Sequence, residues 1–583
     1  MDGPGALAGA DLDWTAAAVP GTAAGAWRDA GRATLEADDL DGRDWWYRTR
    51  VTVDAERWWL HAGGLATLAQ VWVDDRSVLR SDNMFVGHWV DLGPLTGAVS
   101  LTVRFAALAP VLATRRPRPR WKSRLVRNQN MRWLRTSIWG RMPATPSVPP
   151  PVGPWRPIEL HPGSSPVIVG RRLEARPDAD GRGGGTVEVT VVGSFSHADA
   201  TGAHVHAAGS TVAADMSTDQ GLTTLHGIVA VDDVELWWPH THGGRKLYNV
   251  ELTVGAERID LGAVGFRTVD VDRGEDGFAL RVNGVDVFAR GAVWVGPDPV
   301  GLAPDPATIR ADLERYAATG FNLVRVAGTG VYEDEAFWTA CDQLGILVWC
   351  EAMFANLDVP DTPELTESIT EELTQVLVRA ANHPALAVVC GGSEVEQQAA
   401  MLGLGPEAWT PVLLSEVIPH IVDSVGARVP FVASSPTGGD YPFSPGAGVT
   451  HYFGVGAYLR PLHDARRAEV RFASECLAVS VPPEVATAER IPADAWKAAV
   501  PRDTGASWDF EDVRDHYVAD LFALSPSLLR YAQPELALDF GRAATAEMMT
   551  ATIGEWRRAA SPCAGAVVLA WRDVLPGAGW GLL

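Results

Sequence analysis

The sequence has little of three things that limit what a chain can be: cysteine, long apolar runs and net positive charge. Its five cysteines are an odd number, are widely spaced and lack the paired spacing typical of zinc sites, so we interpret them as buried small hydrophobic residues. No apolar stretch reaches the ~18 to 20 residues that cross a bilayer. The net charge of -23 disfavours general attraction to nucleic acid or anionic membranes. We therefore expect no nucleic-acid or membrane partner, and a neutral substrate is compatible with the charge.

The N-terminal residues also lack the pattern of a secretory signal. Residues 1–8 have neither the basic start nor the long apolar centre of a secretory signal, so we expect a cytoplasmic protein. A length of 583 residues predicts roughly three or four folded units. The 23 tryptophans are many for this length; they fit either sugar stacking or the cores of large β-sandwiches, and alone they do not decide between the two.

The first 272 residues have the pattern of all-β structure. Alternating runs at 46–53, 69–73 and 100–105, separated by Gly, Asp and Pro, predict a β-sandwich over 1–164, which we expect to be jelly-roll-like. Clear strands at 185–192 and 247–254 predict a second, immunoglobulin-like β-sandwich over 165–272. The fold class expected for the whole chain is therefore multidomain β plus α/β.

After residue 272 the pattern changes to apolar runs that alternate with amphipathic helices. Helices are predicted at 306–318, with Asp305 as the cap and Pro306 in the first turn, and at 363–381. Eight buried strands are predicted at 287–294, 322–326, 346–349, 385–389, 430–433, 448–452, 469–472 and 565–571. This count and alternation predict a (β/α)8 barrel over 273–583.

Two of the apolar runs finish in a glutamate. Residues 386–394 end at Glu394 and residues 470–475 end at Glu475. This pattern is expected where a buried barrel strand delivers an acid to the rim of a pocket. Hydrolysis of a glycosidic bond typically requires a pair of such carboxyl groups.

A set of motifs then runs in order along nearly the whole chain. The chain resembles the β-mannosidases of glycoside hydrolase family 2 in both the β region and the barrel. The motifs that carry the resemblance are Val19-Pro-Gly-Thr22, Asp44-Trp-Trp-Tyr-Arg48, Ser81-Asp-Asn-Met-Phe85, Trp237-Trp-Pro239, Gly265-Phe-Arg-Thr268, Phe321-Asn-Leu-Val-Arg-Val326, Val331-Tyr-Glu333, Gly345-Ile-Leu-Val-Trp349, Asn382-His-Pro384, His451-Tyr452 and Arg471-Phe-Ala-Ser-Glu475.

The resemblance implies a retaining, exo-acting β-glycosidase that cleaves terminal β-linked sugars of a carbohydrate substrate, with no metal and no organic cofactor. Glu394 would be the general acid and then the base, and Glu475 the nucleophile. Arg325 would keep Glu475 charged and oriented. The neighbouring Glu396 is a competitor for the role of Glu394.

Further positions match those that line the sugar subsite in the family. These are Ser393, His451, Tyr452, Trp571 and Trp139. For a Tyr or Trp that ends a barrel strand, packing is the competing interpretation.

Several of these positions depart from the family pattern. Ser393 stands where the family usually has Asn, and Ala327 stands where it has Trp. Phe453 and Gly456 replace two further tryptophans, and Ser137-Ile-Trp-Gly140 lacks the Asp of the family's Trp-Asp-Trp-Gly segment. The sequence also ends shortly after the eighth strand. We therefore expect the family's C-terminal β-sandwiches to be absent from it. Mannose specificity is consequently left open.

Residues 115–135 carry nine Lys or Arg, no acid, and the tryptophans Trp121 and Trp133. Recognition of an anionic or extended sugar and pairing with acids of the barrel are two interpretations of this segment; nucleic-acid binding is disfavoured by the acidic chain.

Two alternatives to the leading hypothesis remain. One is another family 2 specificity, such as β-galactosidase, β-glucuronidase or exo-β-glucosaminidase. The other is a non-catalytic carbohydrate-binding protein on a degenerate barrel. The sequence does not determine the oligomeric state.

Overall fold

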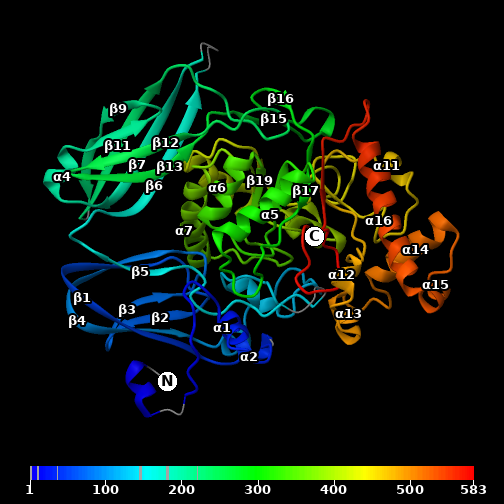
Figure 1. The fold of residues 1–583 in the computed structure, drawn as a ribbon, viewed down its shortest axis with the longest axis horizontal. Helices are drawn as coiled ribbons and strands as arrows, with labels where there is room; N and C mark the ends of the chain where they lie inside the picture. The colour runs from blue at the N-terminus through cyan, green and yellow to red at the C-terminus, as the bar shows by residue number, and fades with distance from the viewer. Residues whose placement is uncertain (1–2, 10–11, 36, 144–147, 179–182, 220) are drawn as a thin grey trace.

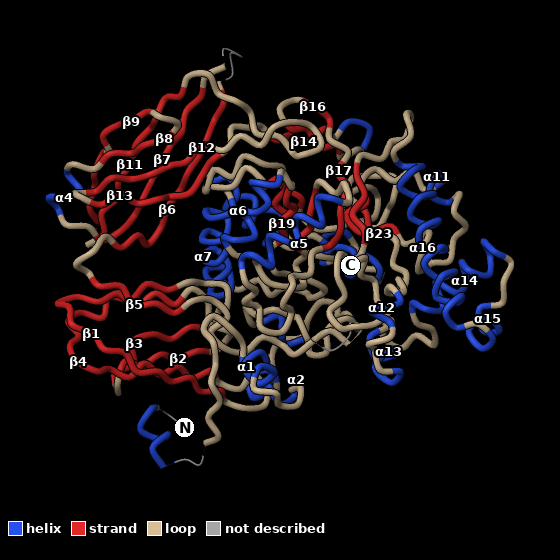
Figure 2. Tube along the Cα trace, in the orientation of Figure 1, coloured by secondary structure: helices blue, strands red, loops and turns tan. Residues whose placement is uncertain are grey.

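The computed structural model describes residues 3–9, 12–35, 37–143, 148–178, 183–219 and 221–583. Two β units lie side by side along one flank of a barrel, and a group of helices covers the opposite flank (Figure 1). The strands of the two β units and of the barrel form separate groups in space (Figure 2). The predicted combination of β units with an eight-stranded parallel barrel is therefore confirmed.

The first β unit is built on a five-stranded antiparallel sheet with the order β3-β2-β4-β1-β5. Two 18-residue strands, β1 and β4, pair along almost their whole length, from Trp45 opposite Phe105 to Ala62 opposite His88. Alternate apolar side chains on these strands enter one core, as the period of two requires. The strands are β1 (Trp45–Ala62), β2 (Ala69–Val73), β3 (Arg76–Ser81), β4 (His88–Phe105) and β5 (Ile158–Pro162).

The second β unit is a sandwich of two four-stranded sheets, ordered β10-β11-β7-β6 and β13-β12-β8-β9. Val187, Val189 and Val191 of β7 are buried and point inward, and they alternate with half-buried residues such as Thr186, Glu188 and Thr190. The strands are β6 (Val167–Pro177), β7 (Gly185–Ser194), β8 (His204–Ala207), β9 (Ser210–Ala213), β10 (Asp215–Asp219), β11 (Leu222–Val231), β12 (Tyr248–Val254) and β13 (Glu257–Val264).

The barrel sheet has eight strands in the order β21-β20-β19-β18-β17-β24-β23-β22, and its ladders are parallel. On the side between β21 and β22, an antiparallel bridge joins Thr437 to Val449. The strands are β17 (Ala289–Val293), β18 (Leu323–Val326), β19 (Leu347–Glu351), β20 (Leu386–Cys390), β21 (Phe431–Val432), β22 (Thr450–Tyr452), β23 (Ala473–Cys476) and β24 (Gly565–Val568).

One predicted strand was wrong. The seventh strand was expected at 469–472, but β23 runs from Ala473 to Cys476. Glu469 instead has a left-handed backbone, with a φ of 49°, which ends the preceding turn. Glu475 is therefore within the strand, where its backbone is held by the ladder to β22.

Helices surround the barrel on the outside, and two of them begin as predicted. Asp305 caps α5 through the backbone N–H of Ala307, and Thr362 caps α7 through that of Leu365. The main helices are α5 (Pro306–Ala318), α6 (Glu335–Leu344), α7 (Pro363–Ala380), α8 (Val395–Met401), α10 (Ile418–Ser424), α14 (Phe510–Phe522), α15 (Pro526–Ala532) and α16 (Pro534–Trp556). No helix among the described residues is both long enough and apolar enough to span a membrane.

The N-terminal end of the barrel is filled by aromatic side chains. Trp349 and Phe472 stack inside it, with ring centres 5.5 Å apart. Phe278 contacts both rings. It lies immediately before β15 in the small sheet of β14 (Val269–Asp272), β15 (Ala279–Val282) and β16 (Val285–Asp286). The open end of the barrel is consequently the end at which the strands finish, where sites of this fold lie.

The first β unit is attached to the barrel by a buried ion pair. Arg135 donates two hydrogen bonds to the carboxylate of Glu372 on α7, at 2.8 and 2.6 Å. The side chains are 6% and 0% exposed, and Asn83 and Tyr332 donate to the same carboxylate. The carboxylate therefore depends on partners from both units.

We expect Arg135→Met to lower the thermal unfolding temperature markedly, because it leaves the buried Glu372 charge without a cation, a change that costs about 3 to 5 kcal/mol. Arg104→Met is the control, since Arg104 pairs with Asp44 at a partly exposed site and such pairs contribute only about 0 to 1 kcal/mol. Equal melting temperatures for the two variants would show that the buried pair does not hold the units together.

Candidate functional site

A buried guanidinium occupies the centre of the barrel mouth. Arg325 on β18 has no exposed side-chain surface. It contacts two carboxylates, those of Glu351 at 2.9 Å and Glu475 at 2.7 Å. Burial opposes a charge here, but the two carboxylates outweigh it and raise the pKa of Arg325. Arg325 is therefore a fixed cation between two acids, as predicted for its contact with Glu475.

Glu475 is held from two sides and remains reachable. Its carboxylate accepts from Nη1 of Arg325, which also donates to the carbonyl of Ser474 at 3.1 Å. The side chain is 15% exposed. A carboxylate in this setting is oriented and open to a ligand.

Glu394 follows β20 through a tight turn. A Cβ on Gly391 would lie 2.3 Å from the carbonyl oxygen of Ala433, and one on Gly392 would lie 2.7 Å from that of Phe354. Glycine at both positions lets the chain pass close to its neighbours. Glu394 then adopts a left-handed backbone, with a φ of 55°, at the N-terminus of α8. Such strain in a non-glycine residue is typical of functional sites.

The carboxylate of Glu394 accepts three hydrogen bonds. They come from Nδ1 of His451 at 2.8 Å, Nε2 of Gln397 at 2.9 Å and Nε2 of Gln398 at 3.2 Å. Burial raises its pKa, but the bonds from His451 and Gln398 and the charge of Arg325 outweigh this, so the pKa of Glu394 is lowered. Its side chain, like that of Glu475, is 15% exposed.

Two chains of hydrogen bonds connect the two glutamates. In the first, Arg325 joins Glu475 to the hydroxyl of Ser393, at 3.3 Å, immediately before Glu394. In the second, Ser435 lies 3.2 Å from His451 and 2.8 Å from Ser474, immediately before Glu475. The structure thus brings Glu394, Glu475, Arg325, Ser393 and His451 into one cluster.

Glu396, the competitor of Glu394, is placed differently. It is 4% exposed, and its carboxylate accepts from the hydroxyls of Thr410 and Thr437 at 3.0 and 2.6 Å. Burial raises its pKa. The side chain is satisfied within the protein and takes no part in the Arg325 cluster.

Two residues expected to line the subsite lie away from the cluster. The hydroxyl of Tyr452 donates to Asp464, and its ring packs on Trp556 of α16. Trp571 donates to Asp312 of α5 at 3.3 Å and packs on Tyr316. Both are in the core between strands and helices. Because side chains alternate along a strand, the inward position of His451 turns Tyr452 outward.

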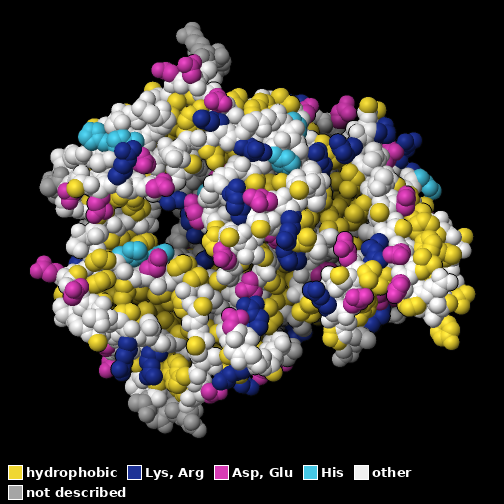
Figure 3. Space-filling model, in the orientation of Figure 1, with side chains coloured by type: hydrophobic (Ala, Val, Ile, Leu, Met, Phe, Trp, Pro, Cys, Tyr) yellow, Lys and Arg dark blue, Asp and Glu magenta, His cyan; other side chains and the backbone are white. Residues whose placement is uncertain are grey.

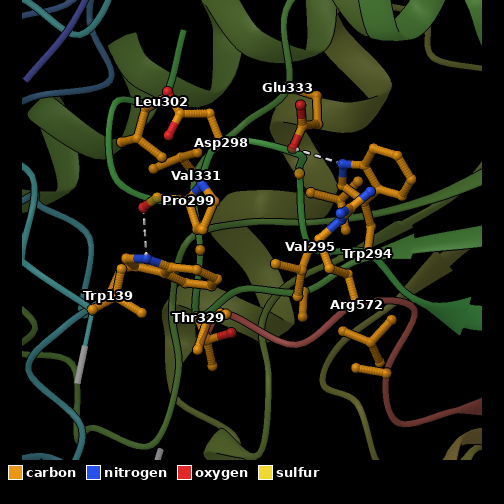
Figure 4. Close-up of a pocket in the computed structure, with 18 of the residues that line it drawn as sticks. Trp139, Trp294, Val295, Asp298, Pro299, Leu302, Thr329, Val331, Glu333 and Arg572 are labelled. Carbon is orange, nitrogen blue, oxygen red and sulfur yellow. Dashed lines mark hydrogen bonds between the residues drawn. The ribbon is translucent and has the colours of Figure 1, made fainter. Parts of the chain in front are cut away.

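A hollow next to the cluster is lined by tryptophans. It lies at the ends of β17, β18 and β24 and includes Trp139, Trp294 and Ala327. Trp139 donates to the carbonyl of Pro299 at 3.2 Å, and its ring faces the hollow (Figure 4). The hollow adjoins Arg325 through Val326, but the two glutamates do not line it. Trp139 is therefore beside the cluster and not in contact with its carboxylates.

Among the acidic residues that line this hollow, Glu333 has the pKa that departs most from its usual value. Nε1 of Trp294 donates to its carboxylate at 3.1 Å (Figure 4). Burial raises the pKa of Glu333 to about 7, although the charge of Arg156 works in the opposite direction. The carboxyl is consequently partly protonated near neutral pH.

Sequence reasoning missed Glu351. It is fully buried at the end of β19 and accepts from Arg325, from Nε1 of Trp349 at 3.1 Å and from the backbone N–H of Gly328 at 2.9 Å. The signal was available, because residues 346–351 are another apolar run that finishes in a glutamate.

The basic segment 115–135 is partly explained by the interface. Arg120 pairs with Asp358 at 2.5 Å, Arg132 lies 3.7 Å from the same carboxylate, and Arg135 pairs with Glu372. For these three residues, pairing with acids of the barrel is confirmed. The segment also reaches the mouth, since Ser123 donates to Gln398, which binds Glu394.

Comparisons with known proteins support the relationship that the motifs predict. Residues 8–156 match the family model of the glycosyl hydrolase 2 galactose-binding domain-like domain. The chain is 28% identical over 467 residues to β-mannosidase B of Emericella nidulans and 29% identical over 463 residues to that of Aspergillus fumigatus. Each alignment covers 72% of this chain and 54% of the relative, so the chain spans about half the length of these curated relatives.

Solved structures show the same fold. A β-D-mannosidase from Dictyoglomus thermophilum superposes with a TM-score of 0.84 at 20% identity, over 99% of this chain and 74% of that one. An exo-chitosanase from Amycolatopsis orientalis superposes with a TM-score of 0.72 at 16% identity, over 98% and 68%. The arrangement of β units and barrel is therefore shared with both.

We expect Glu333→Gln to change how stability depends on pH. The folded protein keeps the Glu333 proton up to about pH 7, whereas a free glutamate loses it near 4.5. The folded state thus binds more protons in this window, and its stability falls as pH rises from about 4.5 to 7. Glutamine removes this loss, so the variant should gain about 1 to 3 kcal/mol over the natural protein at pH 8 but not at pH 4.5. Denaturant unfolding at both pH values measures the gain; an equal effect at both would contradict the assignment.

Proposed function

Because the chain is related to the β-mannosidases of glycoside hydrolase family 2, we propose that it is a retaining exo-β-glycosidase acting on terminal β-linked sugars. The observation that carries the proposal is the cluster in which Arg325 binds Glu475 while His451 binds Glu394. It supplies two partly exposed carboxylates with different partners. This asymmetry is what a double displacement needs.

In the first step Glu475 attacks the anomeric carbon. Arg325, 2.7 Å away, binds the carboxylate and orients the oxygen that attacks. Glu394 gives a proton to the departing glycosidic oxygen, so the bond to the leaving group breaks as the bond to Glu475 forms. The product of this step is a covalent glycosyl ester and the free aglycone.

In the second step Glu394, now ionised, takes a proton from water. The water attacks the anomeric carbon and releases Glu475, which restores the original configuration. The hydrogen bonds from His451, Gln397 and Gln398 favour the charged form of Glu394 in this step. No step requires a metal or an organic cofactor.

The identity of the sugar rests on residues that differ from the family pattern. Ser393 offers a hydroxyl in place of an amide, and Ala327 lines the hollow where a tryptophan is expected. Both changes leave room near Arg325. A panel of aryl β-D-mannoside, glucoside, galactoside, glucosaminide and glucuronide tests the specificity, with β-mannoside hydrolysis as the first expectation. A cytoplasmic location also remains a prediction.

A non-catalytic sugar-binding protein is the alternative from another class. The departures from the family pattern motivate it. The presence of both Glu394 and Glu475, connected through Arg325 and Ser393, argues against it, because binding alone does not need the pair. Calorimetric binding of a sugar without hydrolysis of any member of the panel would favour the alternative.

We expect Glu475→Ala to lower kcat/KM for the best panel substrate by at least ~10³-fold, because the attacking group is removed. Azide, a small anion that fits the vacated space, should restore turnover and form the glycosyl azide of inverted configuration. Glu396→Gln is the control and should keep its activity, since Glu396 binds only Thr410 and Thr437. Full activity of Glu475→Ala, or rescue that gives the retained azide, would refute the role of Glu475.

We expect His451→Phe to move the alkaline limb of the kcat/KM profile to higher pH. The hydrogen bond from His451 is the main influence that lowers the pKa of Glu394 against the effect of burial, so its loss should raise that pKa. The alkaline limb reports the group that must be protonated. A limb that stays in place or moves to lower pH would contradict the proposed pairing.

A further inference from the structure

A cluster of two histidines and one glutamate lies in the first β unit, far along the chain from the barrel glutamates. Its members are His61 on β1 and Glu159 and His161 on β5. β1 and β5 pair antiparallel with His61 opposite Glu159 and Trp59 opposite His161. Since residues two apart on a strand share a face, Glu159 and His161 project on the same side as His61.

The ligand atoms in this cluster are close together. Nδ1 of His61 lies 3.1 Å from Oε2 of Glu159, and Nε2 of His161 lies 3.7 Å from the same oxygen. One ligand atom from each residue falls within 4.8 Å of the other two. Tetrahedral zinc, with bonds of about 2.0 to 2.2 Å, holds its ligand atoms about 3.3 Å apart. The two distances to the Glu159 oxygen lie on either side of that spacing.

Two further observations point to a ligand. The Nε2 atom of His161 is itself inaccessible and has no hydrogen-bond partner within the part of the chain that the structure describes, so it is available to a ligand. The His61 ring stacks on Trp89, with ring centres 4.3 Å apart, and Trp89 also contacts His161 at 5.1 Å. The indole thus restricts the orientation of both imidazoles. Binding an ion therefore costs less side-chain conformational entropy.

We infer that His61, Glu159 and His161 form a site for Zn²⁺, with a fourth position open to water. Two imidazoles and one carboxylate suit zinc among the common divalent ions, and magnesium or calcium would prefer oxygen ligands only.

The position of the site gives the ion a structural role. β5 is an edge strand of its sheet and is the last strand before β6 begins the second β unit. It lies on the side of the first unit that faces the second (Figure 1), where histidine and acidic side chains adjoin on the surface (Figure 3). An ion bound to His61 and His161 would fasten β5 to β1 next to the junction of the two β units.

The chain offers a matched control for this site. His226 on β11 lies 3.3 Å from Glu188 on β7, also on a sheet surface, but without a second histidine. The five cysteines are buried, so they do not compete for added zinc.

The test is titration of the full-length, chelator-treated protein with ZnCl₂ by calorimetry. We expect one equivalent to bind, the dissociation constant to rise at least tenfold in His161→Ala and in Glu159→Gln, and no change in His226→Ala. Thermal melts provide a second measurement: zinc should raise the melting temperature of the natural protein and of His226→Ala but not of His161→Ala. Absence of stoichiometric binding, or unchanged affinity in a His61→Ala/His161→Ala double variant, would overturn the inference.

Discussion

The whole candidate site depends on one buried cation. Arg325 lies at the end of β18 with carboxylates from β19 and β23 on either side. Removing one member of such a group leaves an uncompensated charge at a cost of about 3 to 5 kcal/mol. The three strands are therefore held in one relative position by the same contact that orients Glu475. The fold and the chemistry of the site rely on the same atoms.

The two glutamates differ because their partners differ. Glu475 faces a guanidinium that stays protonated at any ordinary pH. Glu394 faces the imidazole of His451 and the side-chain amides of Gln397 and Gln398. The connection through Ser435 and Ser474 ties these settings together. A substrate that enters between the two carboxyls would meet two acids in different settings, and the proposed retaining hydrolysis requires such a difference.

Much of this arrangement could be predicted from local patterns. The β units, the helices after Asp305 and Thr362, and most barrel strands follow from periodicity and caps, which depend on near neighbours in the chain. The same holds for the general position of Glu394 after β20 and of Glu475 in the last part of β23. Arg325 needed the family resemblance, because an arginine inside an apolar strand has no local signal of its partner.

Other features depend on contacts distant in sequence and could not be read from local patterns. The orientation of Tyr452 and Trp571 toward the helices is set by the pleat and by packing on Trp556 and Tyr316. The true start of β23 depends on the backbone of Glu469. Glu351 is the instructive omission: it obeys the same rule that singled out the other two glutamates, but only the guanidinium beside it shows why it matters.

The most direct measurement is to identify the residue that carries the sugar during turnover. The protein is treated with an activated 2-deoxy-2-fluoro glycoside of the preferred sugar, which slows breakdown of the intermediate, and its peptides are analysed by mass spectrometry. The account predicts one added sugar on the peptide that contains Glu475, bound through its carboxylate. Labelling of Glu394 in its place, or rapid turnover of other substrates with no labelled carboxylate, would contradict it.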